Sequence, residues 1–211
     1  MSQIVLKRTL TLLCGRFGKL GLLMLSLSML VLSSGASGWA AGKSEMDTLT
    51  KGQVVVSQDT EPSNAMPSVE AKILISKSQD KVWSVVANPE KLMREEKKVK
   101  KVKVLSRAGN KQNVEFSVLM TRLLPPFNYI LLQELSAPGL LRFHRISGSF
   151  KDIQGSWRLT PVENGSKTIL TYTLKIDPGP FLPIPRWMLL NAVKSDLPGM
   201  MMNVKASIDK G

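Results

Sequence analysis

Apolar and polar residues alternate with a period of two through most of the chain between residues 68 and 177. This alternation is typical of β-strands that bury one face and expose the other. Turn residues such as Gly, Pro and Asn separate the alternating stretches, as in an antiparallel meander. The pattern predicts about seven strands, at residues 68–76, 99–106, 113–121, 128–135, 140–148, 153–161 and 168–177.

Helical periodicity occurs at two places in the chain. A short helix is expected between Ser78, which can cap it, and the pair Asn88-Pro89, which ends it and starts a second short helix. Near the end of the chain, apolar residues recur every three or four positions over residues 187–208, which predicts one long helix with a kink at Pro198. The order of strand, two short helices, meander and long terminal helix indicates an α+β fold.

The first 40 residues form a separate segment with the composition of an export signal. Basic residues precede an apolar run at 20–32, and small residues that suit a cleavage site before Ala41 follow it. We therefore expect a signal peptide at residues 1–40, with an uncleaved membrane anchor as the alternative. Residues 41–67 form a polar extension with one short strand candidate, and residues 68–211 form the folded domain.

Cysteine is confined to this leader. Cys14 is the only cysteine of the chain, so the mature protein is expected to have no disulfide and no thiolate metal site. Export without cysteines favours a bacterial periplasm, where disulfides are optional.

Three stretches resemble a known superfamily. They are "KVWSVVANPEKL" after the first strand, "GSWRLTPVENGSKTILTY" in the last hairpin, and "DPGPFLPIPRWML" with "SDLPGMM" in the terminal segment. They are similar to the START-like or polyketide cyclase/dehydrase superfamily (SRPBCC), in its coenzyme-Q-binding branch. The resemblance implies a helix-grip fold, in which a curved antiparallel sheet wraps around a long C-terminal helix.

The same resemblance implies a cavity between the sheet and the C-terminal helix. Members of the superfamily bind lipids, sterols, quinones or polyketides there, and only some of them catalyse a cyclisation or dehydration. The apolar faces of the predicted elements supply the expected cavity residues, which are Phe116, Val118, Met120, Tyr129, Leu131, Trp157, Tyr172, Leu174, Trp187, Leu190 and Met201.

The mouth of the cavity can be placed from the meander itself, because alternate connections lie at the same end of an antiparallel sheet. At one end, the connections 122–127, 149–152 and 178–185 each contain a phenylalanine, whereas the connections at the other end are polar turns. Apolar residues gathered on one rim are typical of a ligand entrance or docking surface, and side chains that fold inward and plug the sheet are the alternative. The predicted portal residues are Leu123, Leu124, Phe127, Phe150, Phe181 and Ile184.

The charge of the chain bears on its partners. It has 29 Lys and Arg residues against 16 Asp and Glu, a net charge of +13. Aromatic residues are not interleaved with the basic ones, as a base-stacking surface requires, so nucleic acid is not expected as a partner. Arg122, Lys151 and Arg186 flank the predicted portal and suit peripheral contact with lipid headgroups. The expected partner is a hydrophobic small molecule or lipid.

Candidate catalytic residues are few. His144 is the only histidine, and a single histidine in a strand is usually structural. Glu115 and Glu134 fall on the face opposite the apolar one, which gives a paired-carboxylate mechanism little support. Tyr129 and Tyr172 could orient a ligand through their hydroxyls. We predict an exported binding module with no catalytic residue, metal or cofactor. A cyclase/dehydrase-type enzyme and a docking protein are the alternatives.

Overall fold

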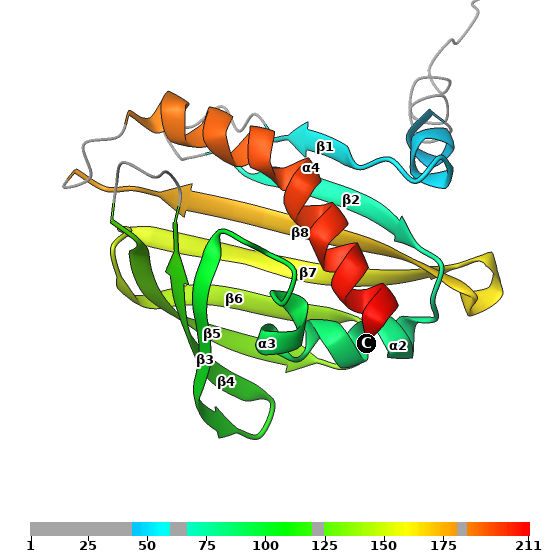
Figure 1. Ribbon diagram of the computed structural model, residues 1–211, viewed down its shortest axis with the longest axis horizontal. Helices are drawn as coiled ribbons and strands as arrows, with labels where there is room; N and C mark the ends of the chain where they lie inside the picture. The colour runs from blue at the N-terminus through cyan, green and yellow to red at the C-terminus, as the bar shows by residue number, and fades with distance from the viewer. Residues whose placement is uncertain (1–43, 60–66, 120–124, 181–184) are drawn as a thin grey trace, which may run out of the picture. The chain divides into compact units, whose positions relative to one another are not determined.

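The computed structural model describes residues 44–59, 67–119, 125–180 and 185–211. The strands are β1 (Val55–Gln58), β2 (Val69–Ile75), β3 (Val99–Ala108), β4 (Lys111–Val118), β5 (Phe127–Ser136), β6 (Leu140–Gly148), β7 (Asp152–Val162) and β8 (Lys167–Asp177). The helices are α2 (Gln79–Val86), α3 (Pro89–Leu92), α4 (Arg186–Lys210) and the short 3-10 helix η1 (Glu163–Gly165), and residues 44–50 are also helical. Helices α2, α3 and α4 all lie on one face of the sheet (Figure 1).

The strands form one antiparallel sheet in the order β1-β2-β8-β7-β6-β5-β4-β3. The predicted helix-grip α+β fold, with two short helices after the first strand of the meander and a long C-terminal helix, is confirmed. The sheet has eight strands rather than about seven. The additional strand β1 comes from the 41–67 segment, where Val55 pairs with Lys72 and Ser57 pairs with Glu70 of β2.

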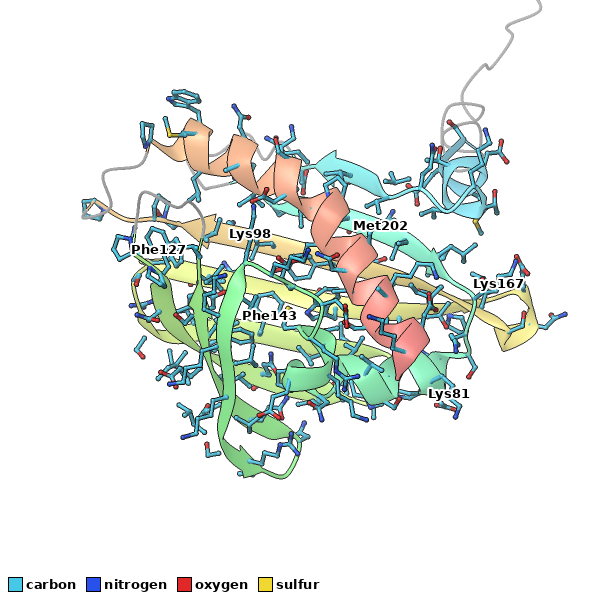
Figure 2. The ribbon with its side chains drawn as sticks, in the orientation of Figure 1. Lys81, Lys98, Phe127, Phe143, Lys167 and Met202 are labelled. Carbon is cyan, nitrogen blue, oxygen red and sulfur yellow. The ribbon has the colours of Figure 1, made fainter. Side chains whose placement is uncertain are left out.

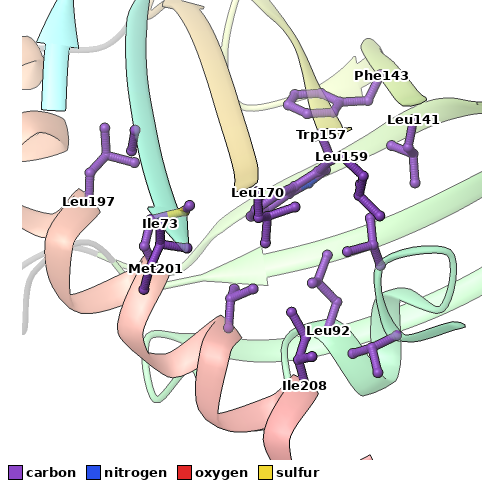
Figure 3. Packing of buried hydrophobic residues seen from close by; sticks show 14 of the residues in the cluster. Ile73, Leu92, Leu141, Phe143, Trp157, Leu159, Leu170, Leu197, Met201 and Ile208 are labelled. Carbon is purple, nitrogen blue, oxygen red and sulfur yellow. The ribbon is translucent and has the colours of Figure 1, made fainter. Parts of the chain in front are cut away.

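One face of the sheet is apolar and the other faces solvent, as the alternation predicts. On β7, Ile153, Trp157 and Leu159 are buried, whereas the intervening Gln154 and Arg158 are exposed. The buried side chains of neighbouring strands meet on this inner face and form the hydrophobic core with the helices (Figure 3). The inner face is therefore where the helices pack.

Helix α4 packs against one edge of the sheet. It contacts β1 and β2, together with α2 and α3, and it crosses in front of the sheet in Figure 1. Its best-buried apolar residues, each at most 3% exposed, are Leu189, Leu197, Met201, Val204 and Ile208. Because the strands that α4 contacts are β1 and β2, the inner face of the remaining strands is available to form a cavity.

The first turn of α4 differs from the predicted apolar stripe. Trp187 is 64% exposed, and the buried residue of this turn is Leu189, which is 1% exposed. Residues two positions apart on an α-helix point about 200° apart. Since Leu189 faces inward, Trp187 must face outward.

The short helix α3 begins at a well-defined cap. The side chain of Asn88 accepts hydrogen bonds from the backbone N–H groups of Glu90 and Lys91, at 3.1 and 3.2 Å. Pro89 occupies the first helical position, where it loses no helical hydrogen bond. The cap fixes α3 against β3 and α4, where it forms part of one wall of the site.

Candidate functional site

A cavity of about 360 Å³ lies between the inner face of the sheet and helices α3 and α4. Strands β3 to β8 contribute its floor, and α4 contributes the opposite wall through residues 193–203. Most of the lining side chains are aliphatic or aromatic, so the cavity is suited to an apolar molecule.

Seven of the eleven predicted cavity residues line this cavity. They are Phe116, Val118, Tyr129, Leu131, Trp157, Tyr172 and Leu174. All seven lie on strands, where the alternation determines which face a side chain occupies. Whether a ligand touches them stays a prediction.

The other four predicted residues lie elsewhere. Met120 lies outside the described residues. Trp187 is exposed to solvent for the geometric reason given above, and Leu190 packs against the core rather than lining the cavity. Met201 is fully buried in the core beneath α4 (Figure 3).

Three consecutive methionines on α4 face three different environments. Met200 lines the cavity, Met201 is 0% exposed in the core, and Met202 is 47% exposed to solvent. Each residue of an α-helix is rotated about 100° from the one before it. Met200 lies on the side of α4 that faces the cavity, together with Val193, Asp196 and Asn203.

The described portal residues point inward. Phe127 and Phe150 are 6% and 4% exposed, line the cavity, and stack with their ring centroids 5.2 Å apart. A backbone hydrogen bond brings them together: the Ser149 N–H donates to the Asn128 carbonyl at 2.8 Å. It ties the β6–β7 connection to the start of β5, where Figure 2 labels Phe127. At these two positions the side chains fold inward and plug the end of the sheet, which was the alternative to a ligand entrance. The other predicted portal residues, Leu123, Leu124, Phe181 and Ile184, lie outside the described part of the chain.

Polar residues at one side of the cavity were not predicted. Lys98 forms an ion pair with Asp196 of α4 at 2.5 Å, and Asn203 of α4 donates a hydrogen bond to Glu96 at 3.1 Å. All four residues line the cavity and join the segment between α3 and β3 to α4. No local pattern could have identified them, since each pair joins residues about one hundred positions apart in sequence.

A second missed residue, Gln133, lies on the inner face of β5. It is 4% exposed and lines the cavity. Its side-chain carbonyl oxygen accepts a hydrogen bond from the side-chain amide of Gln112 at 2.7 Å. Gln112 is also buried and approaches the Ala87 carbonyl at 3.3 Å. Gln133 alternates in phase with the inward-facing Leu131 and Leu135. This alternation could have predicted that Gln133 also faces inward.

Tyr129 and Tyr172 present phenol groups to the cavity. Burial raises the pKa of Tyr129 above its usual value, and burial together with the nearby Tyr129 raises the pKa of Tyr172. The apolar surroundings disfavour the charged phenolate in both cases. Both hydroxyls are therefore neutral hydrogen-bonding groups at neutral and moderately alkaline pH.

These pKa shifts predict how stability changes at alkaline pH. Above about pH 10 the unfolded chain loses its phenolic protons while the native state keeps them, so the free energy of unfolding falls by about 1.4 kcal/mol per pH unit for each tyrosine. Urea unfolding of the wild type between pH 9 and 11.5 is expected to show a steeper fall than that of Tyr129→Phe/Tyr172→Phe. Equal slopes would contradict the buried, neutral phenols.

His144 lies away from the cavity. It is exposed on β6, on the face opposite Leu141 and Phe143, which are buried. Among the described residues, no group of three His, Cys, Asp or Glu side chains could hold a metal ion. None of the described helices is long and apolar enough to cross a membrane.

Residues 75–205 match a family model described as polyketide cyclase / dehydrase and lipid transport. No curated protein sequence matches the chain.

Many solved structures resemble the chain. Human STARD10 has a TM-score of 0.62 at 14% identity, over 83% of this chain and 80% of that chain. A STAR-related lipid transfer protein of Xanthomonas axonopodis has a TM-score of 0.62 at 14% identity, over 74% of this chain and 94% of that chain. The Zhui aromatase/cyclase of a Streptomyces species has a TM-score of 0.60 at 18% identity, over 69% of this chain and 94% of that chain. At these identities the likeness establishes the fold alone.

Proposed function

Because the chain belongs to the polyketide cyclase / dehydrase and lipid transport family, we propose that it binds one small hydrophobic molecule reversibly in the cavity between the sheet and α4. The observation that carries this proposal is the cavity itself, lined by aromatic and aliphatic side chains from β3 to β8. Its volume of about 360 Å³ lies at the small end of the range for ligand sites, which suits a single compact ligand.

Desolvation supplies the driving force. Burying about 300 Å² of apolar ligand surface yields about 7 kcal/mol at 25 cal/mol per Å². Association costs of about 4 kcal/mol or more offset much of this gain. Micromolar binding therefore also requires the packing contacts that the cavity walls make with the ligand.

Filling the cavity is expected to abolish binding. In Val118→Trp/Leu174→Trp, two indoles occupy space that Val118 and Leu174 now border. The affinity for the neutral dye N-phenyl-1-naphthylamine, measured by fluorescence titration, is expected to fall at least tenfold because the dye and the indoles compete for one volume.

The matched control places the same side chains outside the cavity. Leu105 and Ile146 are 45% and 49% exposed, so Leu105→Trp/Ile146→Trp is expected to bind the dye as the wild type does. Thermal unfolding by circular dichroism verifies that both double variants are folded. Binding that survives cavity filling in a folded protein, or a wild type that does not bind the dye, would refute the proposed function.

We also propose that the protein acts after export, on the basis of the leader at residues 1–40. Expression of the full chain in a Gram-negative host is expected to yield a periplasmic protein whose N-terminus is Ala41, as read by mass spectrometry. An intact N-terminus in the membrane fraction would favour the anchor instead.

A further inference from the structure

Two phenol hydroxyls lie in the cavity without a hydrogen-bond partner among the described residues. Tyr129 and Tyr172 both line the cavity, and within the described part of the chain no group forms a hydrogen bond with either hydroxyl. Both tyrosines are only partly buried, so cavity water can bond their hydroxyls while the site is free. A ligand that displaces this water without replacing its bonds leaves the hydroxyls unpaired, at a cost of about 1–3 kcal/mol. Phenylalanine would fill the same space without this cost, so the hydroxyls need an explanation other than packing.

Aromatic contacts fix the direction of both phenols. The ring of Tyr172 lies 4.3 Å from that of Trp157, measured between centroids. The ring of Tyr129 lies between Phe116 at 5.5 Å and Phe150 at 5.8 Å. Such packing holds each hydroxyl in place before a ligand arrives, which lowers the entropy cost of binding through it.

Gln133 adds a third polar group. Its side-chain carbonyl oxygen accepts a hydrogen bond from the Gln112 side-chain amide at 2.7 Å, and this bond orients the Gln133 side chain. Its own amide N–H groups donate to no described residue. The inner face of the sheet thus offers hydrogen-bond donors from β5 and β8 among aliphatic and aromatic side chains.

The charges around the cavity favour a neutral ligand. Lys98, the cation that lines the cavity among the described residues, is paired with Asp196 at 2.5 Å. Glu96 accepts a hydrogen bond from Asn203 at 3.1 Å. A carboxylate ligand would therefore lose its hydration without meeting an unpaired cation, which is costly.

Water that enters the free cavity can bond the two phenols, and a ligand that displaces this water must replace its bonds or leave the hydroxyls unpaired. We propose that the ligand is a neutral, largely apolar molecule with a hydrogen-bond-accepting oxygen, such as a ketone, and that the hydroxyls of Tyr129 and Tyr172 and the amide of Gln133 bind this oxygen. This inference rests on the proposed function, because it specifies the ligand of the same cavity.

Two probes of matched shape test the inference. Benzophenone and diphenylmethane share two phenyl rings and differ in the central group, which is a carbonyl in one and a methylene in the other. Isothermal titration calorimetry gives both dissociation constants for the wild type, for Tyr129→Phe/Tyr172→Phe, and for Thr160→Val, which alters an exposed residue of β7. The quantity compared is the ratio of the two constants in each protein, so the different water solubilities of the probes cancel between proteins.

The wild type and Thr160→Val are expected to favour the ketone about tenfold more than the double tyrosine variant does, since one or two hydrogen bonds are lost. The double variant is expected to keep its affinity for diphenylmethane and its folded state. An equal ratio in the wild type and the double variant overturns this inference while the proposed function stands. A wild type that binds neither probe overturns the proposed function, and the inference with it.

Discussion

Met201→Asp is expected to lower the free energy of unfolding by about 4 kcal/mol or more, the largest effect that we predict for a single substitution. Met201 is 0% exposed in the core between α4 and the sheet. An aspartate there either buries a charge without a partner or takes up a proton, and it also leaves space that the methionine filled.

The neighbouring residue provides the control. Met202 is 47% exposed on the same helix, so Met202→Asp is expected to change stability by no more than about 0.5 kcal/mol. The two variants have the same composition and nearly the same helix propensity, and they differ only in which side of α4 carries the charge. Urea unfolding followed by circular dichroism measures both, and similar losses would show that α4 is not packed as described.

Gly155→Ala is expected to have the second largest effect, a loss of about 3 kcal/mol. A Cβ atom at Gly155 would lie 2.0 Å from the Thr173 carbonyl oxygen and 2.6 Å from the Phe143 ring. The first contact is with the backbone of the paired strand β8, so relief requires the strands to move apart. The ring of Phe143 would also have to leave its position on the inner face, where it lines the cavity.

Gly199→Ala is the matched control for this substitution. Gly199 lies inside α4, and a Cβ atom there would meet nothing within 4 Å. Alanine is the better helix former, so stability is expected to rise by about 0.5–1 kcal/mol. Thermal melts of both variants give the comparison. A Gly155→Ala protein as stable as the wild type would mean that β7 and β8 are less tightly paired than the register indicates.

The strands could be predicted from the sequence because the sheet has one solvated face. On β7 the contrast between buried Trp157 and exposed Arg158 appears directly as alternation. Strand β1 was expected only as the short strand candidate of residues 41–67, and its pairing with the sheet could not be predicted. It has four residues, and its place in the sheet depends on the free edge of β2, with which it pairs.

The same argument explains which cavity residues could be predicted. Tyr129 and Tyr172 lie on strands, where parity alone determines that they face inward. On α4, the choice between Met200 and Met201 depends on a rotation of about 100°, and both residues are apolar. That rotation is set by contacts with β2 and α3, which are distant in sequence.

The methionines of α4 also differ in their exposure to oxidants. Oxidation follows accessibility, so peroxide meets Met188 and Met202, both 47% exposed, before it reaches Met201. A sulfoxide at either exposed position adds a polar oxygen where water already is. The same oxygen on Met201 would enter the core. Oxidation is therefore expected to reach the surface methionines of α4 before it disturbs the packing of the helix.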